Sequence, residues 1–349
     1  MTFALDAALH ARNFEVCLNL GPGETVAVLG PNGAGKSTLL AIIAGLIRPD
    51  SGHATLEQTT LFDLTGGNGH FVPPHARGTA LLAQEPLLFP HMSVLENVAF
   101  GPRAAGATRA EALRTARHWL TEVDATELAG RRPGQLSGGQ AQRIAIARAL
   151  ATDPDLLLLD EPMAALDIHA APMLRRLLKR VLNGRRAVII THDVLDALML
   201  ADRVLILEAG RITEQGPTRE VLETPRSRFA AGLAGLNLLP GTITDHGLTT
   251  RDGLNITGSL DETAGPGHNG VAVFPPSAVS VFPAEEHGSP RNSFPVTITD
   301  LEPHGDQIRV RAGGLSADIT PAASADLGLT PGMTVYFVIK AAAVSIYPA

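Results

Sequence analysis

One short segment limits the folds open to this chain more than any other. Residues 30–38 read Gly-Pro-Asn-Gly-Ala-Gly-Lys-Ser-Thr, which satisfies the spacing G-x-x-x-x-G-K-[S/T]. An apolar run over residues 24–29 precedes the loop as a predicted strand, and residues 36–47 follow it with the composition of a helix. A strand, a glycine-rich loop and a helix in this order predict an α/β domain with a largely parallel sheet.

The chemistry of this loop predicts that it binds a nucleotide. Its glycines let the backbone curl so that N–H groups point at phosphate oxygens, and the helix N-terminus adds partial positive charge. Lys36 is expected to reach the β- and γ-phosphates of ATP, and the Ser37 hydroxyl to ligate Mg²⁺. A turn that binds nothing is the alternative, but it does not explain Lys and Ser at these positions. The expected nucleotide-binding residues are Gly30, Pro31, Asn32, Gly33, Ala34, Gly35, Lys36, Ser37 and Thr38.

A second segment supplies acidic groups. Residues 156–159 are four leucines, which predict a buried strand, and Asp160 and Glu161 follow at its C-terminal end. Ligands bind at that end of parallel strands. Asp160 is expected to hold Mg²⁺ and Glu161 to polarise the attacking water as general base. Alone, the pattern also fits a core strand ending in two solvated acids; beside the phosphate loop it predicts ATP hydrolysis.

Further motifs give the chain a family resemblance. Residues 136–140 read Leu-Ser-Gly-Gly-Gln, and a helix-like segment follows to Leu150. With Gln84, the segment 164–167 and Thr191-His192-Asp193, they resemble, in order, the signature motif, Q-loop, D-loop and H-loop of ATP-binding cassette (ABC) ATPases. The resemblance covers about residues 4–230. It implies a P-loop nucleotide-binding domain over residues 1–232, with a helical subdomain at about 90–150.

The resemblance also implies roles for single residues. Two subunits of the family sandwich two ATP molecules in a homodimer. There the signature motif meets the nucleotide of the facing subunit, so Ser137, Gly138, Gly139, Gln140 and Asp167 join the expected nucleotide-binding set. The resemblance implies three catalytic residues, Glu161, His192 and Gln84. It also implies three residues that contact the Mg²⁺ ion, Ser37, Gln84 and Asp160. The aromatic residue that usually stacks on adenine is not evident. Arg12 and Phe14 are the candidates, and the alternating pattern favours Phe14 as a core strand residue.

The character of the sequence changes near Leu233. From residue 233 to 349, short Val/Ile/Thr-rich runs alternate with Gly and Pro, which predicts an all-β domain with loops at 246–269 and 284–293. Residues 237–245 resemble 292–300, and residues 278–283 resemble 343–348. These ordered matches predict two related β units.

The second β unit resembles the OB-like Mop or TOBE domain of importer ATPases, most closely those for molybdate. Hydroxyls, N–H groups and cations can hold a tetrahedral oxyanion. The candidates are Ser289, Arg291, Thr320, Ser324 and Lys340. We therefore expect an ATPase subunit that powers molybdate import, with molybdate bound in this domain. Sulfate, thiosulfate, iron, sugar or polyamine import are alternatives, and so is a domain that only packs against its neighbours.

Composition bears on the partners. The 349 residues carry a net charge of −7, and the basic residues are scattered, so no nucleic-acid partner is expected. No apolar run approaches the roughly 18 residues needed to span a membrane, and residues 1–6 do not resemble a secretory signal. The resemblance then implies two integral membrane permease subunits, an extracytoplasmic substrate-binding protein, and a place at the cytoplasmic face of the cell membrane. A soluble cassette ATPase acting on nucleic acid or ribosomes, or an anion-storage protein, fits the single cassette and intact motifs less well.

Overall fold

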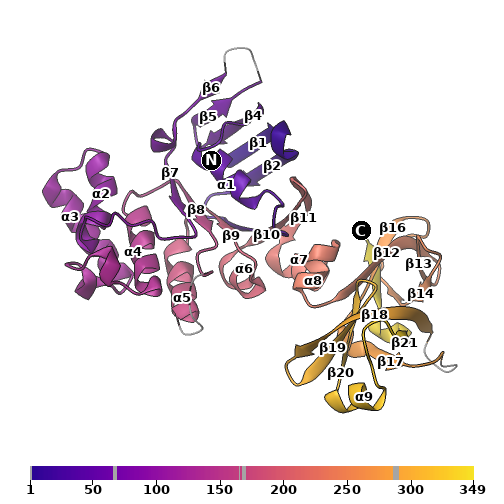
Figure 1. Cartoon of the computed structure of the whole chain (residues 1–349). Coiled ribbons are helices and arrows are strands. Elements are labelled where there is room, and N and C mark those ends of the chain that lie inside the picture. The colour runs from indigo at the N-terminus through magenta and orange to yellow at the C-terminus, as the bar shows by residue number, and fades with distance from the viewer. Residues whose placement is uncertain (1, 66–68, 165, 167–169, 286–290) are drawn as a thin grey trace. The chain divides into compact units, whose positions relative to one another are not determined.

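The computed structural model describes residues 2–65, 69–164, 166, 170–285 and 291–349. Contacts within the chain define two compact units, Met1–Arg219 and Glu220–Ala349 (Figure 1). The domain boundary at residues 232–233 stays a prediction. No helix among the described residues is long and apolar enough to cross a membrane.

A six-stranded sheet forms the centre of the first unit. Its strand order is β11-β10-β3-β9-β8-β7, and every neighbouring pair is parallel except β10 with β11. The inner strands are continuous apolar runs because both faces of the sheet are covered. Their bounds are β3 Thr25–Leu29, β7 Thr79–Leu82, β8 Leu156–Asp160, β9 Ala187–Ile190, β10 Arg203–Glu208 and β11 Arg211–Pro217.

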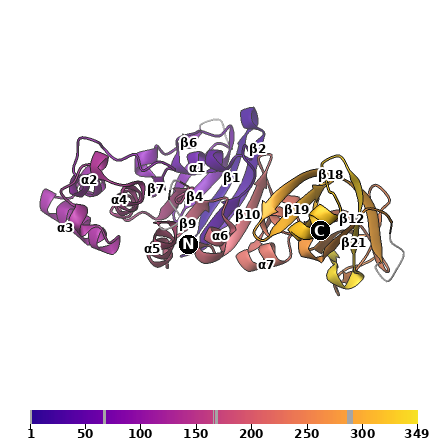
Figure 2. The same ribbon diagram turned by 60° about the horizontal axis from the view of Figure 1, so that its bottom comes forward.

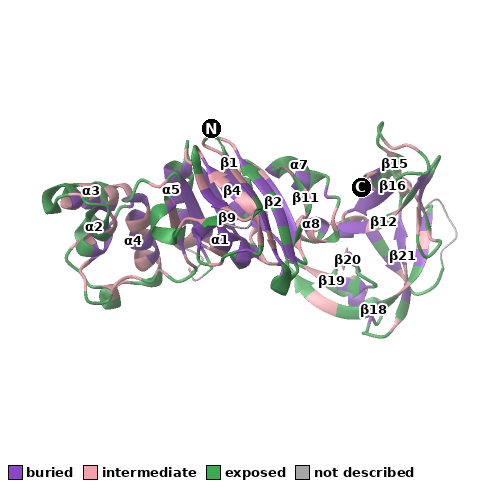
Figure 3. Cartoon of the chain, turned by 90° about the horizontal axis from the view of Figure 1, so that it is seen from above, coloured by how far each residue is buried: buried purple, intermediate pink, exposed green. Residues whose placement is uncertain are grey.

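A second, antiparallel sheet has the order β2-β1-β4-β5-β6. Strands β1 and β2 bury every second residue, since one face of the sheet packs on the core; Figure 3 shows this alternation on β2. The bounds are β1 Phe3–Leu9, β2 Phe14–Leu20, β4 Ser51–Leu56, β5 Thr59–Asp63 and β6 His70–Phe71. The core of this part also contains helix α1, Lys36–Ala44, which Gly45 ends in a left-handed conformation.

The C-terminal end of α1 is held by a buried arginine. Arg77 is 2% exposed, and its Nη1 donates to the carbonyls of Ile42 and Ile43 at 2.8 and 2.9 Å. At the end of the helix the last carbonyls lose their i+4 partners, and the Ile42 carbonyl also accepts from the Gly45 N–H at 3.1 Å. Burial lowers the pKa of Arg77 to about 10, which leaves it charged at neutral pH. A Cβ on Gly45 would lie 2.4 Å from Arg77 Nε, so only glycine fits beside the guanidinium. Arg77 therefore anchors the C-terminal end of α1, the helix that follows the phosphate loop.

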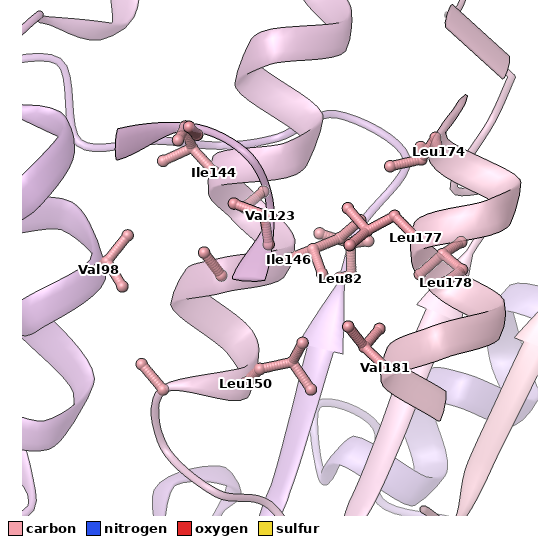
Figure 4. Close-up of a cluster of buried hydrophobic side chains, with 14 of the residues drawn as sticks. Leu82, Val98, Val123, Ile144, Ile146, Leu150, Leu174, Leu177, Leu178 and Val181 are labelled. Carbon is pink, nitrogen blue, oxygen red and sulfur yellow. The ribbon is translucent and has the colours of Figure 1, made fainter. Parts of the chain in front are cut away.

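Helices α4, α5 and α6 lie beside the central sheet, and α2 and α3 pack with α4 at one end of the unit (Figure 2). Helices α2 and α3 begin with capping boxes at Ser93 and Thr108, and α4 with one at Ser137. Figure 4 shows Ile146 and Leu150 of α4 directed toward the side chains of α5, within one buried cluster. The bounds are α2 Val94–Ala104, α3 Arg109–Glu122, α4 Gly138–Leu150, α5 Ala170–Leu182 and α6 Val194–Leu200. Helix α7, Thr218–Glu223, spans the division between the two units.

The second unit holds two sheets that exchange strands. One has the order β14-β13-β12-β16-β22-β15 and the other β17-β21-β18-β19-β20. The last strand of the first repeat, β17, pairs with β21 of the second, and the last strand of the second, β22, pairs with β16 of the first. The bounds are α8 Arg228–Leu233, β12 Asn237–Thr244, β13 Gly247–Thr250, β14 Asn255–Thr257, β15 Ser259–Leu260, β16 Asn269–Phe274, β17 Val279–Phe282, β18 Asn292–His304, β19 Gln307–Ala312, β20 Leu315–Ile319, α9 Pro321–Asp326, β21 Thr334–Ile339 and β22 Ser345–Pro348.

The two repeats also share a side-chain contact. Asn237 and Asn292, which begin the two matching segments, are 3% and 1% exposed. The amide of Asn237 bonds both the N–H and the carbonyl of Ser316, and the amide of Asn292 bonds both groups of Thr257. Each repeat thus satisfies backbone groups of the other, so both repeats build one body.

Some expectations about elements were wrong. Residues 246–269, predicted as a loop, contain β13, β14 and β15, because the turn formers there separate short strands rather than replace them. Asn292 and Ser293, placed in the second expected loop, already pair in β18. The first helix ends at Ala44, before the predicted residue 47, because Gly45 adopts a positive φ of 80°.

Candidate active site

Register gathers the expected catalytic residues at one edge of the central sheet. Val28 of β3 pairs with Ile190 of β9, and Ile190 pairs with Asp160 of β8. Since these strands are parallel, their C-terminal ends meet at the same edge. The phosphate loop follows β3, His192 follows β9 after one residue, and Gln84 follows β7 after one residue.

The phosphate loop is built by close backbone approaches. A Cβ on Gly30 would lie 2.1 Å from the Leu207 carbonyl oxygen, so no side chain fits there. Gly33 and Gly35 have φ of 80° and 104°, which glycine adopts at little cost. The Ala34 N–H donates to the Pro31 carbonyl at 3.2 Å and closes the turn. The loop therefore reaches α1 with N–H groups left over for an anion.

Lys36 lies inside this loop. It is 8% exposed, and its Nζ donates to the carbonyl oxygens of Gly30 and Pro31 at 2.6 and 3.0 Å. Burial lowers the pKa of Lys36, while the charges of Glu161 and Asp160 oppose that shift. A bound phosphate would favour the charged ammonium.

Ser37 and Asp160 form an oxygen pair beside this lysine. Burial raises the pKa of Asp160, and the neighbouring Glu161 charge raises it further, while a hydrogen bond from Ser37 and the charge of Lys36 lower it. A divalent cation would stabilise the ionised carboxylate. Mg²⁺ is bound in proteins by one or two oxygen side chains together with phosphate and water, so a hydroxyl and a carboxylate fit it. No cluster of three or more His, Cys, Asp or Glu side chains suited to a metal occurs among the described residues.

Glu161 is the point where three expected catalytic residues meet. Gln84 Nε2 lies 3.4 Å from Glu161 Oε2, and His192 Nδ1 lies 3.6 Å from Glu161 Oε1. Glu161 has a φ of 45°, which is unusual for a residue with a side chain, and its N–H donates to the Ile190 carbonyl at 3.0 Å. The His192 side chain is 67% exposed, so this side of Glu161 is open to a substrate.

A buried ion pair behind His192 escaped the sequence analysis. Arg175 of α5 contacts the carboxylate of Asp196 at 2.5 Å, with both side chains buried. Asp196 also accepts from the Thr191 hydroxyl at 3.0 Å, and the Thr191 hydroxyl accepts from the Asp193 N–H at 3.1 Å. The pair therefore fixes the segment that carries His192. The only sequence signals were an Arg and an Asp on otherwise apolar helix faces.

The signature segment is separate from the cluster around Glu161. Ser137 caps α4, with its Oγ accepting from the Gln140 N–H and Gln140 Oε1 accepting from the Ser137 N–H. Ser137 and Gly138 are exposed, and Gly139 and Gln140 are partly exposed. No hydrogen bond or ion pair joins these four residues to the phosphate loop in the part of the chain described. Asp167 lies outside the described residues.

The candidate oxyanion residues fall into two groups in the second unit. Arg291 and Lys340 flank the paired residues Asn292 and Ile339 of β18 and β21, and both side chains are exposed. Thr320 caps α9 with its Oγ1 accepting from the Ala323 N–H, and Ser324 is buried in that helix. Ser289 lies outside the described residues. Within the described ranges, no hydrogen bond or ion pair links the two groups.

Comparison with known proteins defines the class. Residues 14–164 match the family model of the ABC transporter, and residues 288–346 match the TOBE domain. The dimeric structure of a post-hydrolysis state of the ATP-binding cassette MJ0796 bound to ADP and Pi is similar, with a TM-score of 0.53 and 28% identity. The likeness covers 63% of this chain and 99% of that chain. These matches establish an ABC ATPase fold followed by a β-rich TOBE region.

Two relatives place the chain among the ATPases of importers. The Molybdenum import ATP-binding protein ModC of Mycobacterium tuberculosis is 48% identical over 99% of this chain and 97% of its own length. The Sulfate/thiosulfate import ATP-binding protein CysA of Methylococcus capsulatus is 46% identical over 65% of each chain. The chain belongs to the family of ABC import ATP-binding proteins, and it is an ATPase that binds ATP.

We predict that Glu161→Gln leaves ATP binding within about threefold of wild type and lowers hydrolysis at least about a hundredfold, because the amide cannot accept the water proton. Steady-state ATPase assays and calorimetric titration with ATP measure the two effects. Glu127→Gln, which changes an exposed carboxylate remote from the sheet edge, is the matched control and should behave as wild type. Wild-type turnover in Glu161→Gln would remove Glu161 from the role of base.

Proposed function

We propose that the chain is the ATP-hydrolysing subunit of an importer for molybdate. The observation that carries this proposal is the extent of similarity to the molybdenum importer relative, which spans 99% of the chain and therefore includes the whole second unit. The sulfate relative aligns over only 65% of the chain. The ATPase domain alone occurs in importers for many substrates, so the match over the C-terminal unit is what favours molybdate over sulfate.

The site geometry supports a division of labour in hydrolysis. The phosphate loop and Lys36 bind the triphosphate, and Ser37 with Asp160 would hold Mg²⁺, which neutralises charge on the phosphates. Glu161 accepts the proton of the attacking water, His192 and Gln84 orient the water beside it, and the exposed side of Glu161 admits the γ-phosphate. Arg175 and Asp196 act through the segment that carries His192.

A second copy of the chain would complete each site. The N-terminus of α4 is an exposed group of N–H donors, and among the described residues no hydrogen bond joins it to the phosphate loop of its own subunit. In a homodimer, Ser137, Gly138, Gly139 and Gln140 would meet the nucleotide of the facing subunit, with Asp167 close to the shared interface. The similar cassette of known structure is described as dimeric.

The permease subunits would dock beside Gln84. Leu87 and Phe100 are 63% and 42% exposed, an unusual exposure for apolar side chains. Arg148 of α4 donates to the carbonyls of Pro86 and Leu87 at 3.1 and 2.9 Å. A permease contact at this surface would therefore move both Gln84 and the signature helix. With two such subunits and an extracytoplasmic substrate-binding protein as partners, the chain would lie at the cytoplasmic face of the membrane.

The importer proposal predicts a selective transport defect. Replacing Glu161 by Gln in the chromosomal gene should abolish uptake of radiolabelled molybdate at nanomolar supply, while uptake of labelled sulfate stays within about twofold of the parent. The reason is that uptake against a gradient requires hydrolysis. A strain carrying Glu127→Gln is the control. Unchanged molybdate uptake, or loss of sulfate uptake instead, would contradict the assignment of the cargo.

The second unit is proposed to bind molybdate as a regulator of transport. The proposed site is the first group: Arg291 and Lys340 supply cations at neighbouring strand ends, with the Ser289 hydroxyl two residues before Arg291 in the sequence, whereas Thr320 and Ser324 belong to the separate group at α9. An anion too small for a fixed set of donors leaves some unpaired, at a cost of about 1–3 kcal/mol each if buried. Molybdate should therefore be preferred over the smaller sulfate. The alternative is a unit that only packs against its neighbours.

We predict that the full chain binds molybdate or tungstate more tightly than sulfate, and that Lys340→Ala weakens molybdate binding about tenfold through loss of a charged contact. Calorimetric titration of the dimeric chain measures both. Arg251→Ala removes another exposed cation of the same unit and should have no effect. Absence of binding at millimolar molybdate would leave a packing role for the unit, and equal affinity for sulfate would contradict the size argument.

A further inference from the structure

A cavity of about 450 Å³ lies between helices α4 and α5, and its described lining residues include none of the phosphate loop or of the cluster around Glu161. Three arginines line it, Arg143 of α4 and Arg176 and Arg180 of α5. Asp124, in the turn after α3, is the one carboxylate among the described lining residues. The lining side chains therefore carry three positive charges and one negative charge. This excess of positive charge suits an anion with two negative charges.

Two of the arginines are held by bonds that do not neutralise them. Arg143 Nη1 donates to the carbonyls of Val123 and Asp124 at 3.2 and 2.6 Å. Arg180 Nη2 donates to the carbonyl of Glu122. A carbonyl carries no net charge, so these bonds orient the two guanidinium groups and leave their positive charges in place. Each guanidinium has five N–H donors, so donors remain for a further acceptor.

The third arginine, Arg176, makes no hydrogen bond or ion pair within the described residues. The ion pair at the cavity is a weak one, because Arg180 Nη2 lies 3.9 Å from Asp124 Oδ2 and both side chains are mostly exposed. Arg176 and Arg180 lie four residues apart on α5 and so on the same face, and α5 contains no acidic residue. Like charges at this spacing repel each other, and an anion bound between them would remove the repulsion.

The rest of the cavity wall is apolar. Leu177 is buried and belongs to the cluster of apolar side chains that Figure 4 shows. Met173 is 58% exposed, and Pro172 beside it is exposed as well. Cavities of a few hundred Å³ hold small organic molecules, and a bare phosphate ion would fill only part of this one. The apolar wall therefore suits the organic part of a ligand whose anionic group contacts the arginines.

We propose that this cavity binds a small organic molecule that carries a dianionic phosphate group, with the phosphate held by Arg143, Arg176 and Arg180. A guanidinium matches a phosphate in shape, because two parallel N–H groups can meet two of its oxygens. The bound molecule contacts both the helix that begins with the signature segment and the helix whose Arg175 holds the segment of His192. It therefore lies between two parts of the ATPase that the phosphate loop does not join.

Calorimetric titration of the full chain with phenyl phosphate tests the proposal. The chain is first saturated with Mg–ADP, so that the phosphate loop is filled and cannot bind the probe. At about pH 8 phenyl phosphate is a dianion, since its second pKa lies near 6. It should bind at least about tenfold more tightly than inorganic phosphate, which lacks the apolar ring, and than benzenesulfonate, which has the ring but a single negative charge. Equal affinity for phenyl phosphate and benzenesulfonate would contradict a site for a dianion.

Three variants assign the binding to this cavity. Arg176→Ala should weaken phenyl phosphate binding about tenfold through loss of a charged contact, and it should leave the melting temperature unchanged. Asp124→Asn should tighten binding about threefold, because it removes the negative charge that repels the ligand. Lys179→Ala is the matched control, since Lys179 is an exposed cation of the same helix that does not line the cavity, and it should bind as wild type does. The proposal is overturned if phenyl phosphate does not bind at millimolar concentration, if Arg176→Ala binds it normally, or if Lys179→Ala weakens binding as much as Arg176→Ala.

Discussion

The buried ammonium of Lys36 is the contact on which the rest of the site depends. Its hydrogen bonds to the carbonyls of Gly30 and Pro31 hold the loop closed, and the loop in turn removes the lysine from water. Burial disfavours the positive charge on Lys36, and it also disfavours the negative charge on Asp160. A polyanion and a cation arriving together relieve both penalties, which is why this arrangement suits a metal–nucleotide complex.

The parallel sheet brings the proposed catalytic residues together. Parallel register brings the ends of β3, β7, β8 and β9 to one edge, so that Gln84, Glu161 and His192 meet although they are far apart in the sequence. Three other side chains hold the segments that carry these residues. Arg77 holds the far end of α1, Asp196 holds the segment of His192, and Arg148 ties α4 to the residues after Gln84.

The parts predicted from the sequence are those that local rules determine. The phosphate loop and the strand before Asp160 carry their own spacing and periodicity, and the fold class followed from them. Arg175 and Asp196 were missed because their meaning appears only when α5 and α6 pack together. The repeat between Asn237 and Asn292 was visible, but the exchange of β17 and β22 was not, since either strand fits either sheet by composition. The same limit applies to the oxyanion residues, which the structure places in two groups.

The central claim is that each ATP site uses the phosphate loop of one subunit and the signature segment of another. Its most direct measurement is ATPase activity after mixing Lys36→Ala with Ser137→Arg. Each variant alone should be inactive, and the Ser137→Arg monomer should still bind ATP. A mixed dimer pairs an intact loop with an intact signature segment at one site, so the equimolar mixture should regain activity, about a quarter of the wild-type rate. An inactive mixture, or loss of ATP binding by isolated Ser137→Arg monomers, would contradict the account.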